Sequence, residues 1–267
     1  MKIGFIGGGA MGEALIKGIL SHGELTPAEV FVSELTAERC IYLHDTYGVT
    51  AVGGPESFLE DIDVLFLAVK PQVADVAISA FNEKVKKDTV VVSIIAGFTL
   101  EQLEAYFPLQ PVVRVMPNTP LMVGEGMAAL APGKRASAEQ VQLVRELFLA
   151  CGRAIVVKEN IIDAVTGLSG SGPAYAFLVI DAMADGGVAA GLSRQDAIML
   201  AAQTLLGSAK MVLETGKHPD VLRDQITSPA GTTIAGVRVL EQHGVRGAFI
   251  DAVMAATEKS AAMGKKK

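Results

Sequence analysis

Residues 2–12 read Lys-Ile-Gly-Phe-Ile-Gly-Gly-Gly-Ala-Met-Gly, an apolar run that passes directly into a glycine-rich turn. The run Lys2–Ile6 is typical of a buried strand, and a helical pattern follows it. In a G-x-G-x-x-G turn, Gly7 permits the tight bend, Gly9 lets the backbone approach a pyrophosphate, and Gly12 lets the helix pack closely on the sheet. Because the free N–H groups of the helix start favour phosphate, the sequence predicts a dinucleotide-binding loop.

The second strand ends at Ser33 and Glu34, where such loops contact the adenosine ribose. A carboxylate there accepts hydrogen bonds from ribose hydroxyls and repels a 2′-phosphate, which favours NAD. Ser33 and the nearby Arg39 could instead serve NADP. The residues alone leave these alternatives open.

The rest of the first half continues as alternating short strands and helices, which predicts a doubly wound α/β fold with a parallel sheet. Several strands are apolar throughout, as expected for strands buried on both faces. The predicted strands are Lys2–Ile6, Val30–Ser33, Val64–Val69, Thr89–Ile94, Val112–Met116 and Ala154–Val157.

After about residue 160 the pattern becomes entirely helical, with expected helices at 173–191, 194–215, 219–226, 231–243 and 245–262. The first of these is apolar or small on nearly every side, so we expect it to be buried all round, although five helices hardly supply enough neighbours within one subunit. The change predicts two domains, residues 1–158 and 159–267.

Ligands of doubly wound sheets lie beyond the carboxyl ends of the strands. That edge should carry the segments that begin at Ala68, Ala96 and Met116, and we expect them to contact the nicotinamide and its ribose. The cofactor-binding residues predicted from these loops and from the glycine-rich turn are Ile6, Gly7, Gly8, Gly9, Ala10, Met11, Gly12, Ser33, Glu34, Ala68, Val69, Lys70, Pro71 and Asn118.

A second polar cluster, Ser228–Thr233, opens the helix expected at 231–243 with several hydroxyls and free backbone N–H groups. Such a helix start can hold a carboxylate, although ordinary helix capping explains the same residues equally well. The chain shows no histidine or cysteine spacing typical of a metal site and no G-x-S-x-G turn. Hydride transfer to an already activated acceptor therefore fits better than chemistry that needs a dedicated base.

Composition narrows the class of protein further. Of 267 residues, 50% are hydrophobic and 19% are charged, which is unusually apolar, yet the greasiest runs, 62–69 and 90–96, are much shorter than the roughly 18–20 residues that span a bilayer. We therefore expect no membrane span, and a large core or subunit interface to take the apolar excess. A net charge of −6, with one basic run at 265–267, argues against nucleic acid. Two widely separated cysteines indicate reduced thiols and a cytoplasmic location.

The whole chain resembles the pyrroline-5-carboxylate reductases, through the segments IGFIGGGAMG, AVKPQ, VMPNTP, GLSGSGPAYAF, SAKMVLETGKHP and DQITSPAGTTIAGVRVLE. Two positions depart from the family pattern. Ala230 stands where the family usually has glycine, and Glu34 is acidic near the site where the family commonly handles the 2′-phosphate of NADP.

This resemblance implies a Rossmann-type domain followed by an all-α dimerisation domain, and reduction of 1-pyrroline-5-carboxylate to L-proline. The cofactor implied is NADPH, with NADH as the second candidate. Ser228, Gly231, Thr232 and Thr233 would bind the substrate, with the Thr233 hydroxyl near the ring nitrogen as the catalytic group. The implied assembly is a homodimer able to form a ring of dimers.

Two other functions fit parts of the sequence. A β-hydroxyacid-dehydrogenase-like oxidoreductase would share the two-part architecture, but the lysine typical of that class is absent from Pro173–Phe177. A non-catalytic dinucleotide sensor would need only the first half, whereas both halves carry loops suited to ligands.

Overall fold

The computed structural model describes residues 1–23 and 25–264, so the basic run at 265–267 lies outside the described residues. The chain forms two compact units, which are treated separately below. The first contains Met1–Gly170 together with the C-terminal residues from Ala256 onward, and the second is Ser171–Ala255.

The first unit is built on one eight-stranded sheet in the order β3-β2-β1-β4-β5-β6-β7-β8. All neighbouring strands are parallel except β6 and β7, which are antiparallel. Strand order reverses beside β1, which pairs with both β2 and β4. The strands are β1 Ile3–Ile6, β2 Val30–Ser33, β3 Thr50–Val52, β4 Val64–Leu67, β5 Val90–Ser93, β6 Val112–Met116, β7 Gly126–Pro132 and β8 Gly152–Val156.

The predicted doubly wound sheet is confirmed, with two strands added. β3 is only three residues long and lies at the sheet edge, so its apolar pattern is weak. β7 reads Gly-Met-Ala-Ala-Leu-Ala-Pro, and alanine, glycine and proline are all poor strand formers. Tertiary pairing with β6 and β8 therefore determines β7, and β7 and β8 both run antiparallel to the other six strands.

Two hydrophobic cores cover the two faces of this sheet. On β4, Val64 and Phe66 belong to one core, whereas Leu65 and Leu67 belong to the other. The strand is thus buried on both faces, as its continuous apolar run predicted. The Phe66 ring stacks on Phe5 of β1 with 4.7 Å between ring centroids.

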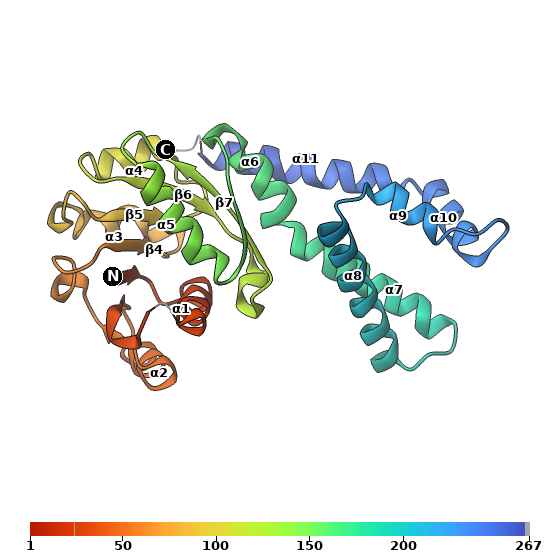
Figure 1. The fold of residues 1–267 in the computed structure, drawn as a ribbon, viewed down its shortest axis with the longest axis horizontal. Coiled ribbons are helices and arrows are strands. Elements are labelled where there is room, and N and C mark those ends of the chain that lie inside the picture. The colour runs from red at the N-terminus through yellow and green to blue at the C-terminus, as the bar shows by residue number, and fades with distance from the viewer. Residues whose placement is uncertain (24, 265–267) are drawn as a thin grey trace. The chain divides into compact units, whose positions relative to one another are not determined.

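Helices flank the sheet on both sides (Figure 1). α1, α2 and α5 contribute to the core that contains Phe66, and α3 and α4 to the other. A short π-helix, Thr166–Gly170, ends the continuous part of this unit, and the last residues of α11 return to it through a 2.7 Å hydrogen bond from Ser260 Oγ to Asp163 Oδ1. The helices are α1 Ala10–His22, α2 Ala37–Tyr47, α3 Ala74–Ser79, α4 Leu100–Tyr106, α5 Ala138–Leu149 and α6 Ile162–Val165.

The second unit is helical, as predicted, and its element bounds lie within two residues of those expected from the sequence. Pro173 occupies the first turn of α7, where its missing N–H costs nothing. α7 and α8 pack against each other at Gly187 and Ala197. The helices are α7 Gly172–Ala189, α8 Arg194–Thr215, α9 Pro219–Gln225, α10 Thr232–Gln242 and α11 Val245–Gly264.

Within a single chain the first of these helices is not buried all round, as the small number of neighbouring helices led us to expect. Ala184 is the one buried residue of α7, whereas Phe177 is 64% exposed and Leu178 is 71% exposed. The physical reason is that few helices of one chain pack around it. α8 is also mostly exposed. Its length and composition alone would allow it to cross a bilayer, so the expectation of no membrane span does not hold for α8 on those two criteria.

Candidate functional site

The glycine-rich turn joins β1 to α1. Gly7 has φ +99°, and a Cβ placed on it would lie 2.7 Å from the Ala68 carbonyl oxygen. A Cβ on Gly12 would lie 2.6 Å from the Gly7 carbonyl oxygen, so both positions require glycine. By contrast, a Cβ on Gly9 would meet no atom within 4 Å. Gly9 is also the N-cap of α1 and makes no side-chain cap, which leaves an open backbone cradle at the start of a helix.

A cavity of about 330 Å³ lies beside this turn at the carboxyl edge of the sheet. It brings together several of the residues predicted to bind a cofactor, namely Gly9, Ala10, Met11, Ala68, Val69, Lys70 and Pro71. The remaining lining residues are Ile94, Ala96, Met116 and Pro117. The last three belong to segments predicted to contact the nicotinamide, whereas Ile94, which directly follows β5 at the same edge, was not singled out.

The other predicted cofactor residues do not line this cavity. Ile6 is buried in the hydrophobic core. Gly7, Gly8 and Gly12 belong to the glycine-rich turn but do not line the cavity. Ser33 and Glu34 lie at the end of β2, beside the turn. A binding role for any of these residues stays a prediction.

Asn118 is nearly buried, and both the nitrogen and the oxygen of its side-chain amide form hydrogen bonds within the protein. Its Nδ2 donates to the Ser169 carbonyl oxygen at 3.1 Å, and its Oδ1 accepts from the Met127 N–H at 2.8 Å. Asn118 therefore braces three segments of the first unit: the loop after β6, the start of β7 and the π-helix. A cofactor contact from Asn118 stays a prediction.

Charged side chains gather at the end of the turn nearest β2. The Glu34 carboxylate accepts from the N–H groups of Gly8 at 2.9 Å and Leu35 at 2.8 Å. Arg39 donates from Nε to the Gly8 carbonyl oxygen at 2.8 Å, and its Nη2 pairs with the Glu13 carboxylate.

Glu13, on the first turn of α1, holds Arg39 and two tyrosines together. Tyr42 and Tyr47 donate their hydroxyls to Glu13 Oε1 at 3.0 and 2.7 Å. Although burial raises the pKa of Glu13, the hydrogen bonds from Arg39, Tyr47 and Tyr42 bring that pKa below its usual value. Burial, reinforced by the bond to Glu13, raises the pKa of Tyr47 to about 12. Of this cluster, Arg39 alone was singled out from the sequence.

In the second unit, the predicted substrate residues surround the start of α10. Gly231 is the N-cap and makes no side-chain cap hydrogen bond. Its N–H donates to the Ser228 carbonyl oxygen at 3.1 Å, and a side chain at Gly231 would collide with the Ser228 hydroxyl. Ser228 and Thr232 are exposed, and Thr233 is half-buried. The geometry offers an anion free helical N–H groups with hydroxyls close by.

Comparison with known proteins identifies the family. A family model for pyrroline-5-carboxylate reductase dimerisation matches residues 159–263, and a model for NADP oxidoreductase coenzyme F420-dependent proteins matches residues 2–97. The pyrroline-5-carboxylate reductase of Methanosarcina acetivorans is 46% identical over 99% of this chain and 98% of its own length. The chain belongs to the pyrroline-5-carboxylate reductase family. The Escherichia coli reductase is 42% identical over 99% of this chain and 98% of its own.

Solved reductase structures also match over nearly the full length. That of Plasmodium falciparum, with NADP bound, has a TM-score of 0.89 at 32% identity and covers 99% of this chain and 98% of its own. That of Coxiella burnetii has a TM-score of 0.93 at 32% identity and covers 99% of both chains. The predicted family and its two-part fold are therefore confirmed.

Within this reductase-family chain, Ala230 stands out in the loop before α10. Among the described residues it is the one non-glycine with positive φ, at +56°. A left-handed conformation costs an L-residue roughly 1–2 kcal/mol, a cost that glycine does not have. The expected presence of glycine here in the family has a physical reason, and alanine is tolerated at the expense of strain.

We therefore expect Ala230→Gly to stabilise the protein by about 1 kcal/mol, which thermal unfolding at fixed protein concentration would measure. Ala235→Gly, inside α10, is the matched control and should destabilise by about the same amount. Equal losses of stability in both variants would contradict the assignment of strain to Ala230.

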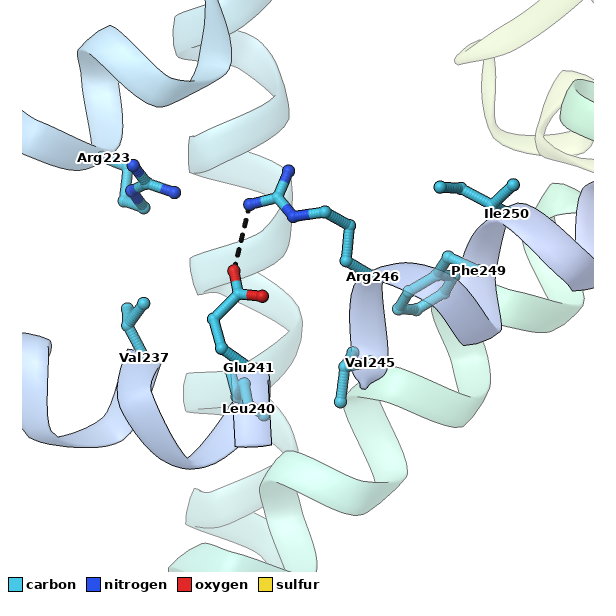
Figure 2. Close-up of a pocket in the computed structure, with 8 residues that line it drawn as sticks. All are labelled: Arg223, Val237, Leu240, Glu241, Val245, Arg246, Phe249 and Ile250. Carbon is cyan, nitrogen blue, oxygen red and sulfur yellow. Dashed lines mark hydrogen bonds and ion pairs between the residues drawn. The ribbon is translucent and has the colours of Figure 1, made fainter. Parts of the chain in front are cut away.

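A larger cavity, of about 550 Å³, lies among the helices of the second unit and contains none of the predicted site residues (Figure 2). Arg246 pairs with Glu241 there at 3.1 Å, and Arg223 lies nearby (Figure 2). The rest of the lining is apolar: Val237, Leu240, Val245, Phe249 and Ile250. All of these residues fall within the region matched by the dimerisation family model.

Proposed function

We propose that this chain reduces 1-pyrroline-5-carboxylate to L-proline, the last step of proline biosynthesis, with hydride from NAD(P)H. The observation that carries the proposal is 46% identity to a pyrroline-5-carboxylate reductase over essentially the whole of both chains. The cofactor expected from the relatives is NADPH, because a solved relative has NADP bound, and NADH is the second candidate.

The residues of the first unit fit this cofactor. The turn from Gly7 to Gly12 would hold the pyrophosphate through backbone N–H groups, and Ala68–Pro71 would hold the nicotinamide side of the cavity. The reduced nicotinamide supplies a hydride when it is bound. Asn118 would keep the neighbouring loop in place through its two hydrogen bonds.

The residues of the second unit would hold the substrate. The carboxylate would lie among Ser228, Gly231, Thr232 and Thr233 at the α10 N-terminus, where the hydroxyls and the N–H groups of the two threonines can donate to it; Gly231, whose own N–H donates to the Ser228 carbonyl oxygen, adds no side chain there. The Thr233 hydroxyl would lie at the ring nitrogen and orient it. Since a protonated imine is already electrophilic, a hydride can add to its carbon while the C=N electron pair moves to nitrogen. The protein then needs mainly to position the reactants and exclude water.

The proposal extends to the organisation of the enzyme. Residues 1–158 would form the dinucleotide-binding domain and residues 159–267 the dimerisation and substrate-binding domain, a boundary that agrees with the start of the dimerisation match. We further propose a cytoplasmic homodimer that assembles into a ring of dimers. The alternatives of a β-hydroxyacid dehydrogenase and a non-catalytic sensor are not favoured by the relatives.

The direct test is oxidation of NADPH or NADH by the purified chain with and without pyrroline-5-carboxylate, with proline identified as the product. Oxidation that depends on the imine and forms one proline per nucleotide supports the proposal. Binding of nucleotide without turnover would favour the sensor instead.

Gly12→Val should lower nucleotide affinity about 100-fold or more, because its side chain would collide with the Gly7 carbonyl at the pyrophosphate turn. Gly53→Val is the matched control, since a Cβ at Gly53 meets nothing within 4 Å. Titration of nucleotide by fluorescence measures both variants. Unchanged affinity in Gly12→Val would contradict the placement of the pyrophosphate.

A further inference from the structure

We propose that Glu34 and the Glu13–Arg39 ion pair make this enzyme discriminate against a 2′-phosphate, so that it works more efficiently with NADH than with NADPH. This inference rests on the proposed function and concerns which of its two cofactors the chain favours. It departs from the expectation based on relatives, because it depends on residues of this chain around the glycine-rich turn.

Hydrogen bonds hold the Glu34 side chain in a fixed position. Its two carboxylate oxygens accept from the N–H groups of Gly8 and Leu35 at 2.9 and 2.8 Å, so the side chain is held against the turn. The adenosine ribose of a bound dinucleotide lies at this end of the second strand. A ribose 2′-hydroxyl can donate a hydrogen bond to the carboxylate, whereas a 2′-phosphate brings negative charge toward it.

Arg39, the nearby cation that could receive a 2′-phosphate, is already bound to groups of the protein. Its Nε donates to the Gly8 carbonyl oxygen, its Nη2 pairs with Glu13, and its guanidinium lies 4.8 Å from the centre of the Tyr42 ring. Its side chain is 27% exposed and that of Glu13 is 20% exposed, so solvent only partly screens the pair. Arg39 would have to give up some of these contacts to receive a phosphate.

The charged side chains around this end of the turn carry a net negative charge. Glu13, Glu34 and Arg39 together place two carboxylates against one guanidinium, and the two tyrosine hydroxyls that bind Glu13 favour its ionised form. A phosphate adds further negative charge to a cluster that already has an excess of it. Glu34 thus acts directly on the ribose, and Glu13 is a positioning residue that keeps Arg39 from serving the phosphate.

The test compares kcat/KM for NADH and NADPH at saturating pyrroline-5-carboxylate. We expect the wild-type enzyme to favour NADH about tenfold and Glu34→Gln to lower that preference by about tenfold. Glu38→Gln is the matched control: it removes the same charge from an exposed carboxylate four residues away and should leave the ratio unchanged. Glu13→Gln should raise kcat/KM for NADPH, an effect that loss of stability alone would not produce.

Two outcomes would overturn the inference: a wild-type preference for NADPH, or the same cofactor ratio in Glu34→Gln as in the wild type. Arg39→Met separates the roles of the charges, since a selective loss of NADPH activity would show that Arg39 already serves the phosphate. Titration with NAD⁺ and NADP⁺ in the absence of imine keeps the two proposals distinct. Tighter binding of NAD⁺ by a chain that reduces no imine would support this inference and contradict the proposed function.

Discussion

Replacing Thr233 with alanine is expected to lower kcat for pyrroline-5-carboxylate about 100-fold while leaving nucleotide affinity nearly unchanged. Thr233 is the second residue of α10 and is half-buried beside the exposed backbone of Gly231. Its hydroxyl would orient the ring nitrogen, and loss of one well-placed hydrogen-bonding group in a site of this kind costs roughly 10²–10³ in rate. Steady-state kinetics combined with nucleotide titration measures both quantities.

Thr233→Ser is the matched variant, because it keeps the hydroxyl and removes only a methyl group. We expect it to retain most of the activity that alanine loses. Wild-type turnover in Thr233→Ala would exclude a catalytic role, and equal losses in both variants would indicate packing of the methyl group instead. A loss of nucleotide affinity would point to a disturbed fold.

Leu178→Glu is expected to convert the proposed dimer of the full-length chain to monomer at micromolar concentration. Leu178 is 71% exposed on α7, next to the exposed Phe177, and lies within the matched dimerisation region. Burying an unpaired carboxylate in an apolar interface is costly, and both subunits would carry it, so the dimer dissociation constant should rise at least about 100-fold. Light scattering or sedimentation over a concentration series measures the change.

Val76→Glu provides the control for this substitution. Val76 is 80% exposed on α3 and lies outside the matched dimerisation region, so the same new charge there should leave the assembly unchanged. A wild-type chain that is already monomeric would remove the basis of the prediction. Dissociation in both variants would indicate a general loss of stability.

The parts of the fold that could be predicted are those that local sequence determines. β4 and β5 are continuous apolar runs because both of their faces are buried, and α7 to α11 begin and end at proline, glycine and hydroxyl residues. β7 could not be predicted, because its alanines form a strand only when β6 and β8 lie on either side. The exposure of α7 depends on how many helices pack around it, which its own apolar sequence does not determine.

The same distinction applies to the candidate site. The glycine-rich turn is contiguous, so its conformation can be read from spacing alone. The Glu13 cluster joins residues 26 to 34 positions apart, and Asn118 contacts Ser169 across 51 positions. No local pattern reports such pairings. The sequence pattern therefore singled out Arg39 and Asn118 but not the side chain and backbone groups that hold them, Glu13 and Ser169.

The return of the C-terminal end of α11 to the first unit has a consequence for how the protein is made. The N-terminal sheet is synthesised first. Ser260, which bonds to Asp163, and Met263, which lies near Gly97, are synthesised only after the second unit, Ser171–Ala255. Although domains generally begin to fold in the order of synthesis, the nucleotide-binding unit can complete its own packing only after the helical unit has left the ribosome.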